Sequence, residues 1–259
     1  MNMSFYTGAV GAYQQNQRMN VQANNIANVN NYGFRAERAT FHHLMYGNVT
    51  GIDEEQLPKG TGTKMVKASV DYESRGYQET GRTFDFAIAG SGFFALFDPS
   101  SQEISFTRDG AFMMARFEVP PPEDAEPEID PDTGEELPLE NTVEWRLSDN
   151  EGRCVLDPDG NFIVIDPENR QADLNIGVFD YRIYDGMVHA DSGRFLPTEK
   201  NGDLYLGTGE VKRGYLEMSN VDLAQELVKV IESQRAYSYA LKMVQTTDEI
   251  EQTINGLPN

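Results

Sequence analysis

Residues 222–255, DLAQELVKVIESQRAYSYALKMVQTTDEIEQTIN, decide the fold that we expect of this chain. Apolar and amide side chains recur along this stretch at alternating intervals of four and three residues, which is the pattern of one helix face. The repeating positions are Leu223, Leu227, Val230, Gln234, Tyr237, Leu241 and Val244. Asp222 followed by Gln225 resembles a capping box, and Gly256-Leu257-Pro258 predicts the end of the helix.

A second helix is predicted at the start of the chain, from about Ser4 to Val29. Its repeating positions are Phe5, Ala9, Ala12, Asn16, Met19, Ala23 and Ile26, and they are mostly small, so a partner helix can approach closely. Neither helix has a partner nearby in sequence, and an isolated helix of this kind is only marginally stable in water. We therefore expect the first helix to pair with the last in a coiled-coil-like core.

The sequence between the two helices is typical of β-structure. Residues 66–77 and 84–97 are rich in β-branched and aromatic residues, and turn dipeptides recur, for example Asp109-Gly110 and Asp185-Gly186. Residues 118–140 contain ten acidic residues and no basic one, which predicts an exposed acidic insert. The predicted class is α+β. The expected order is an N-terminal helix (1–32), an extended connector (33–63), an antiparallel β-rich domain (64–215) and a C-terminal helix (216–259).

The composition excludes several kinds of partner. The chain has 259 residues, with 42 Asp and Glu against 21 Lys and Arg, for a formal charge of −21. This charge repels phosphate backbones and anionic headgroups, so we expect neither nucleic acid binding nor membrane insertion. The N-terminus shows no cleavable signal peptide. Cys154 is the single cysteine, and its apolar neighbours predict that it lies in the core.

No catalytic, cofactor or metal site is predicted. Asp130, Asp132 and Gly134 have some of the spacing of a calcium loop but fail its twelve-residue pattern, and Asp157-Pro158-Asp159-Gly160 is typical of a turn. His42 and His43 are adjacent in an extended segment, so they point to opposite sides. Gly90-Ser91-Gly92 lacks the following helix of a phosphate site, which favours a tight turn.

One stretch carries more information than its local structure requires. Residues 23–35, ANNIANVNNYGFR, contain more Asn than a capped helix end needs. This stretch resembles the N-terminal signature of the bacterial flagellar hook–basal body proteins, the axial subunits of rod and hook. The resemblance continues in order along the chain, in Gly214-Tyr215-Leu216-Glu217, Ser219-Asn220-Val221-Asp222, Gln234-Arg235-Ala236-Tyr237 and Gln245-Thr246-x-Asp248-Glu249. Residues 84–94 and 106–112 resemble the family's β-domain motifs.

The resemblance implies a structural protein and not an enzyme. A member would leave the cell through the flagellar type III export apparatus without a cleaved signal peptide. It would self-assemble in the basal body, with copies of itself and other rod and hook subunits, into a tube that transmits torque for motility. The chain is too short for the large outer domain of a hook subunit, so a rod subunit is favoured, distal over proximal.

The assembly interface is predicted on the two terminal helices and the Asn-rich link. Its residues are Phe5, Ala12, Met19, Ala23, Asn24, Asn25, Ile26, Asn28, Gly33, Phe34, Leu223, Leu227, Val230, Gln234, Arg235, Tyr237, Leu241 and Val244. Three alternatives stay open. The chain could be a hook or hook-like subunit, an acidic surface β-domain that binds a ligand, or a peptidoglycan hydrolase, although no nucleophile and acid occur in a recognisable frame.

Overall fold

The structure is a computed structural model that describes residues 3–44, 47–50, 56–60, 62–120, 142–170 and 172–257. The chain divides into two compact units, which we call the helical unit (Met1–Glu73 and Ser219–Asn259) and the β unit (Ser74–Met218). Most of the predicted acidic insert, including Asp130, Asp132 and Gly134, lies outside the described residues.

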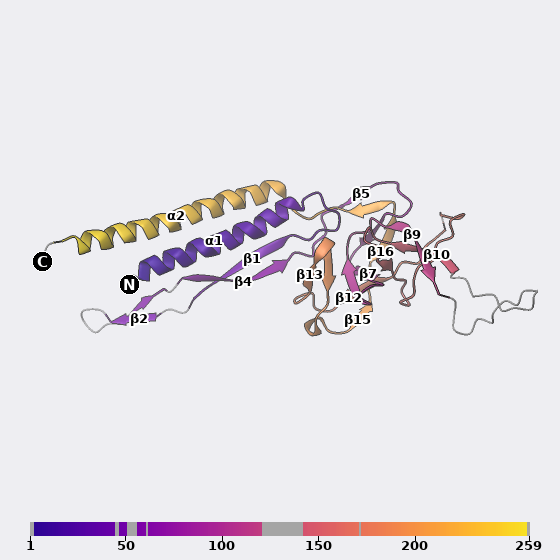
Figure 1. Ribbon diagram of the computed structural model, residues 1–259, viewed down its shortest axis with the longest axis horizontal. Helices are drawn as coiled ribbons and strands as arrows, with labels where there is room; N and C mark the ends of the chain where they lie inside the picture. Colours follow the sequence, from indigo (N-terminus) through magenta and orange to yellow (C-terminus); the bar gives the residue numbers. More distant parts are fainter. Residues whose placement is uncertain are drawn as a thin grey trace, which may run out of the picture. The chain divides into compact units, whose positions relative to one another are not determined.

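The helical unit contains both long helices, α1 (Met3–Ala27) and α2 (Leu223–Asn255), which run side by side (Figure 1). Its strands are β1 (Glu37–His43), β2 (Gly47–Thr50), β3 (Gln56–Lys59) and β4 (Thr63–Val70). β1 pairs antiparallel with β4, from Glu37 opposite Val70 to His43 opposite Thr63, and β2 pairs with β3. Both β1 and β4 contact α1, so α1 lies between α2 and a β-ribbon.

The caps of α2 agree with the sequence. Asp222 has extended backbone angles, and its side chain accepts a hydrogen bond from the Gln225 backbone N–H at 3.2 Å, which satisfies one free donor of the first turn. The helix ends at Asn255, and Gly256 donates its N–H to the Gln252 carbonyl at 3.0 Å.

The expected coiled-coil-like core is wrong. Two α-helices occur among the described residues, beside a large antiparallel β-sheet domain, and several of the predicted apolar positions of α2 are exposed rather than buried between the helices. The buried residues of α2 are Glu226, Ser233 and Thr247, whereas Leu223, Leu227 and Leu241 are 44%, 48% and 38% exposed. The mixture of helices with an antiparallel β-rich middle is consistent with the expected α+β class.

Small residues explain which faces of the helices meet. A Cβ added at Gly8 of α1 would lie 3.0 Å from Val244 Cγ2, and one added at Gly11 would lie 3.9 Å from the Ala240 Cβ. The Ser233 hydroxyl donates to the Lys229 carbonyl at 2.8 Å, and the Thr247 hydroxyl donates to the Met243 carbonyl at 2.7 Å. Because these hydrogen bonds within the helix satisfy the hydroxyls, both residues can be buried. A prediction from hydrophobic periodicity treats Gly, Ser and Thr as interruptions of the apolar pattern. It therefore selects a face of α2 next to the one that contacts α1.

The β unit is built around a nine-stranded antiparallel sheet within the described residues. The strand order is β13-β14-β8-β7-β11-β10-β9, with β12 paired to β7 and β15 paired to β12. Those strands are β7 (Phe93–Phe97), β8 (Ile104–Thr107), β9 (Met113–Val119), β10 (Thr142–Ser148), β11 (Cys154–Val155), β12 (Val178–Tyr181), β13 (Val188–Ala190), β14 (Arg194–Leu196) and β15 (Leu204–Leu206). Two smaller pairs are β6 (Phe86–Ala89) with β16 (Glu210–Arg213) and β5 (Tyr77–Glu79) with β17 (Tyr215–Glu217).

The core of the β unit is apolar and aromatic. Its buried members include Phe86, Ile88, Phe94, Leu96, Phe112, Leu147, Val155, Ile163, Ile165, Ile176 and Val178. Cys154 is fully buried beside them, as its apolar neighbours predicted, and burial raises the pKa of its thiol. Gly110 is required because a Cβ there would lie 1.7 Å from the Phe86 carbonyl oxygen, against which the Asp109-Gly110 turn packs.

Candidate assembly site

Three buried polar side chains bind the loops at one end of the helical unit, and we call this cluster the asparagine junction (Asn25, Arg35 and Asn220). Asn25 is 1% exposed in the last turns of α1. Its Nδ2 donates to the Glu37 carbonyl at 2.8 Å, and its Oδ1 accepts from the Glu37 N–H at 2.9 Å. The Asn25 side chain therefore satisfies both the N–H and the carbonyl of Glu37, the first residue of β1, in the way that a neighbouring strand would.

Asn220 binds three backbone groups in the same region. Its Oδ1 accepts from the Ala36 N–H at 2.7 Å, and its Nδ2 donates to the carbonyls of Asp71 and Glu73 at 2.8 and 3.0 Å. It lies two residues before the cap of α2. This single side chain joins the start of β1, the end of β4 and the entry to α2.

Arg35 completes the junction and is 1% exposed. Its guanidinium donates to the Glu73 carbonyl at 3.0 Å. Burial raises the pKa of the neighbouring Tyr72 to about 12, and the charge of Arg35 partly opposes that rise. Tyr72 is therefore neutral at physiological pH, so the Arg35 guanidinium does not meet a phenolate there.

The predicted interface residues divide into three groups in this structure. Ala12, Asn25 and Gly33 are buried within the chain, and Met19, Ile26, Asn28, Phe34, Val230, Tyr237 and Val244 are half-buried. Phe5, Ala23, Asn24, Leu223, Leu227, Gln234, Arg235 and Leu241 are exposed. The helices bring Val244 against Gly8, whereas the exposed leucines of α2 contribute a free apolar surface. Their place in an interface stays a prediction.

Sequence reasoning missed several residues that organise this unit. Gln14 is buried on α1 and accepts a hydrogen bond from the Met65 N–H at 2.6 Å, which attaches β4 to the helix. Arg35 and Asn220 belonged to recognised motifs, which was a usable signal for their importance. Nothing in the local pattern marked Glu226, which is 5% exposed and pairs with Lys229 at 2.5 Å.

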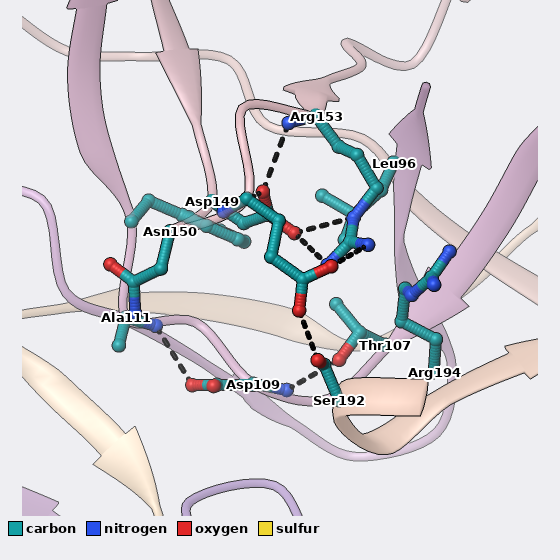
Figure 2. Close-up of a pocket in the computed structure, with 11 residues that line it drawn as sticks. Leu96, Thr107, Asp109, Ala111, Asp149, Asn150, Arg153, Ser192 and Arg194 are labelled. Atoms are coloured by element: carbon teal, nitrogen blue, oxygen red, sulfur yellow. Dashed lines mark hydrogen bonds and ion pairs between the residues drawn. The ribbon is translucent and has the colours of Figure 1, made fainter. Parts of the chain in front are cut away.

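The β unit carries a small polar cavity of about 120 Å³, shown in Figure 2. Arg153 lies at its centre and donates to Asp149 at 2.6 Å and to Glu151 at 2.5 Å, while Ser192 donates to Glu151. Asp109 lies on the opposite side, and its carboxylate accepts from the Ala111 N–H at 3.0 Å. Three of the charged groups in the lining of this cavity, Arg153, Asp149 and Glu151, therefore pair with one another.

A metal site requires several ligating side chains that lie close together. Among the described residues, no group of three His, Cys, Asp or Glu side chains could hold an ion. His42 and His43 both lie on β1 and are exposed, and Asp157-Pro158-Asp159-Gly160 forms the predicted turn, with Asp157 accepting from the Asp159 N–H at 3.0 Å. Neither described helix is long and apolar enough to cross a membrane.

Comparison with known proteins shows which proteins this chain resembles. Residues 212–257, which include α2, match the family described as "Flagellar basal body rod FlgEFG protein C-terminal". A flagellar basal-body rod protein FlgG of Buchnera aphidicola is 29% identical over 273 residues, covering 98% of this chain and 99% of that protein. The chain is therefore similar to flagellar basal-body rod proteins along nearly its whole length.

Other relatives show that the similarity to rod proteins covers more of the chain than the similarity to a hook protein. The rod protein FlgG of Bacillus subtilis is 28% identical, with 99% of each chain covered. The hook protein FlgE of Borreliella burgdorferi is 33% identical over 120 residues, but the match covers 43% of this chain and 27% of the hook protein. The similarity to rod proteins therefore spans the whole chain, and the similarity to a hook protein is partial.

Proposed function

We propose that this chain is a structural subunit of the flagellar basal-body rod, which polymerises through its terminal helices into a tube that transmits torque to the hook. The observation that carries the proposal is the end-to-end alignment with rod proteins, which covers 98–99% of this chain. A hook subunit is the second candidate, and the partial match to a hook protein supports it less.

The exposed apolar residues of α2 support polymerisation. Leu223, Leu227, Val228 and Ile231 lie within three turns of the helix, and each is 44–56% exposed. An exposed apolar patch of this kind favours contact with another protein surface over contact with water. Copies of the same chain are the simplest partners for this patch, because every copy carries it and all copies are present together.

The remaining parts of the proposal concern location, export and chemistry. The subunit acts in the basal body and reaches it through the flagellar export apparatus without a cleaved signal peptide. Its role is mechanical rather than enzymatic, and the pairing of Arg153 with Asp149 and Glu151 in the lining of its polar cavity is in keeping with that. Its partners are copies of itself and the adjoining rod and hook subunits.

Deletion of the gene in its host, followed by electron microscopy of purified basal bodies, tests the proposal. We expect basal bodies that lack a complete rod, no hook or filament, and loss of motility, all restored by the wild-type gene. Mass spectrometry should find the protein in wild-type basal bodies. Complete rods in the deletion strain, or absence of the protein from basal bodies, would contradict the proposed function.

A further inference from the structure

A cavity of about 150 Å³ lies in the helical unit where α1, β1 and α2 meet. It is lined from α1 by Arg18, Val21 and Gln22, from β1 by Glu37, Arg38 and Ala39, and from α2 by Glu226 and Lys229. The space exceeds the roughly 30 Å³ that one water molecule occupies in the liquid, so it has room for the end of a side chain. We call it the helix-junction cavity.

Gln22 makes this cavity unusual. Its side chain is 3% exposed, and its Oε1 has no hydrogen-bond partner among the described residues. A buried carbonyl oxygen without a donor costs about 1–3 kcal/mol, so such atoms are normally satisfied. The occupant of the cavity must therefore provide an N–H or O–H donor to Gln22.

Arg18 provides the complementary group. It lies four residues before Gln22, so both side chains share one face of α1 and both line the cavity. We find no hydrogen bond or ion pair to Arg18 within the described ranges. Arg18 is half-buried and its guanidinium offers donors only, so an occupant with an acceptor oxygen suits it.

The remaining charges around the cavity balance one another. Lys229 pairs with the buried carboxylate of Glu226 at 2.5 Å, and Arg38 pairs with Asp71. Three cations (Arg18, Arg38 and Lys229) and two anions (Glu37 and Glu226) line the cavity, and Asp71, the partner of Arg38 outside the lining, balances the third cation. A neutral occupant fits this balance, and a carboxylate would place two acceptor oxygens against the Gln22 carbonyl.

We propose that the helix-junction cavity receives the side-chain carboxamide of a Gln or Asn from a second copy of this chain. The carboxamide NH₂ group donates to Gln22 Oε1, and its oxygen accepts from the Arg18 guanidinium. Exposed amides on the terminal helices are available for this contact: Asn16, Asn20, Asn24, Gln225, Gln234 and Gln245. The inference rests on the proposed function, because it requires copies whose helices pack together.

Such a contact would define the register between copies. An apolar helix surface tolerates sliding by one turn, about 5.4 Å, because it meets similar side chains again. A buried amide that must reach one donor and one acceptor loses both when it slides, and single polar residues specify register in helical assemblies in this way.

Gln22→Met tests the proposal, because it preserves the length of the side chain and removes the acceptor. We expect the unfolding midpoint of the purified chain to stay unchanged or rise, since an unsatisfied acceptor is removed. Incorporation into basal bodies, normalised to exported protein, should fall at least tenfold, and Arg18→Met should act similarly. A lower unfolding midpoint, or undiminished incorporation, would overturn the proposal.

Gln17→Met is the matched control on the same helix. Gln17 is half-buried, donates to the Tyr13 hydroxyl at 3.0 Å and does not line the cavity. It should retain incorporation close to the wild-type value. If Gln17→Met lowers incorporation as much as Gln22→Met, the effect is not specific to the cavity and the proposal fails.

A photo-crosslinking amino acid at position 18 identifies the occupant in assembled flagella. We expect an adduct with a terminal-helix peptide of a second copy that contains Gln or Asn. An adduct with a different protein, or none in intact basal bodies, means that another group or water fills the cavity, and the proposal is wrong. Either crosslinking result is compatible with the proposed rod function if the wild-type protein is present in basal bodies. If the wild-type protein is absent from basal bodies, the rod function itself is refuted.

Discussion

At the scale of single residues, the Asn220 side chain makes three hydrogen bonds to backbone groups at the asparagine junction, although Asn220 lies in a loop. Its amide binds Ala36, Asp71 and Glu73, none of which is near it in sequence. Loss of the side chain leaves one N–H and two carbonyls without that partner, and each buried unsatisfied group costs about 1–3 kcal/mol.

Asn220→Ala should therefore lower the free energy of unfolding by about 2–4 kcal/mol, measured by urea denaturation followed through helical circular dichroism. Asn31→Ala is the control, because Asn31 is exposed and its side chain donates to the side-chain oxygen of the neighbouring Asn28 at 2.7 Å. It should cost less than about 1 kcal/mol. Equal losses in the two variants would show that the junction contributes no special stability.

Asp109 illustrates the opposite case, a carboxyl group whose charge is unfavourable in the fold. Burial raises its pKa, the charges of Asp149 and Asp85 add to the rise, and the hydrogen bond from the Ala111 N–H partly opposes it. Because the folded pKa is above the unfolded one, the stabilising protonation is complete at low pH and is lost as the pH rises through the folded value.

Asp109→Asn keeps the acceptor oxygen for Ala111 and removes the charge. We expect the urea midpoint of the variant to exceed that of the wild type at pH 7, and the difference to shrink as the pH falls towards 4. Asp159→Asn, in an exposed turn, should show no comparable change between the two pH values. A variant that is less stable than the wild type at pH 7 would contradict the interpretation.

At the scale of elements, the contact between α1 and α2 depends on the absence of side chains at specific positions of α1. Gly8 has little room for a methyl group, because its added Cβ would lie 3.0 Å from Val244 Cγ2 and 3.3 Å from the Ala240 carbonyl oxygen. Gly11, one turn later, has ordinary contact distance to Ala240. Gly8 and Gly11 therefore differ in the room that each leaves for a side chain, although both lie in α1.

Gly11→Ala should stabilise the chain by about 0.5–1 kcal/mol, because Ala favours a helix interior over Gly. In Gly8→Ala the same gain is opposed by displacement of Val244, so the variant should be less stable than Gly11→Ala. Thermal unfolding of the two proteins provides the comparison. If both variants were stabilised equally, the helices would not pack as closely as the structure indicates.

At the scale of the whole molecule, the exposed leucines of α2 should matter to assembly and not to the folding of the isolated chain. Leu227 and Leu241 are 48% and 38% exposed, so truncation to Ala removes little buried apolar surface from the subunit. In a polymer that covers these side chains, the same truncation costs up to about 2–5 kcal/mol for each fully buried leucine, repeated in every copy.

The Leu227→Ala, Leu241→Ala double variant should therefore unfold within a few degrees of the wild type, yet fail to build rods and give non-motile cells. Export must be measured separately by assaying secreted protein, because a secretion defect would resemble failed assembly. Glu232→Ala, at an exposed charged position of α2, is the control and should retain motility. Functional flagella made from the exported double variant would show that these leucines are not part of the assembly interface.

Several features of this protein were available from its sequence alone because they depend on neighbouring residues. The Asp222 cap needs only Gln225, three positions away, and the Asp157 turn needs only Asp159 and Asn161. The burial of Cys154 follows from its apolar surroundings in a strand. The Asn-rich and C-terminal motifs indicated the rod and hook family, because their residue types and order persist along the whole chain.

Tertiary structure alone decided which faces and which amides are buried. Periodicity selected Leu227 and Leu241, but close packing between two backbones needs small side chains, so Ser233 and Thr247, each seven residues from Ala240, are buried instead. Asn220 bonds to Ala36 across 184 positions of sequence, a distance over which no local pattern indicates a partner. Local rules determine where helices and turns begin and end, whereas the pairing of their surfaces depends on contacts that exist only once the chain has folded.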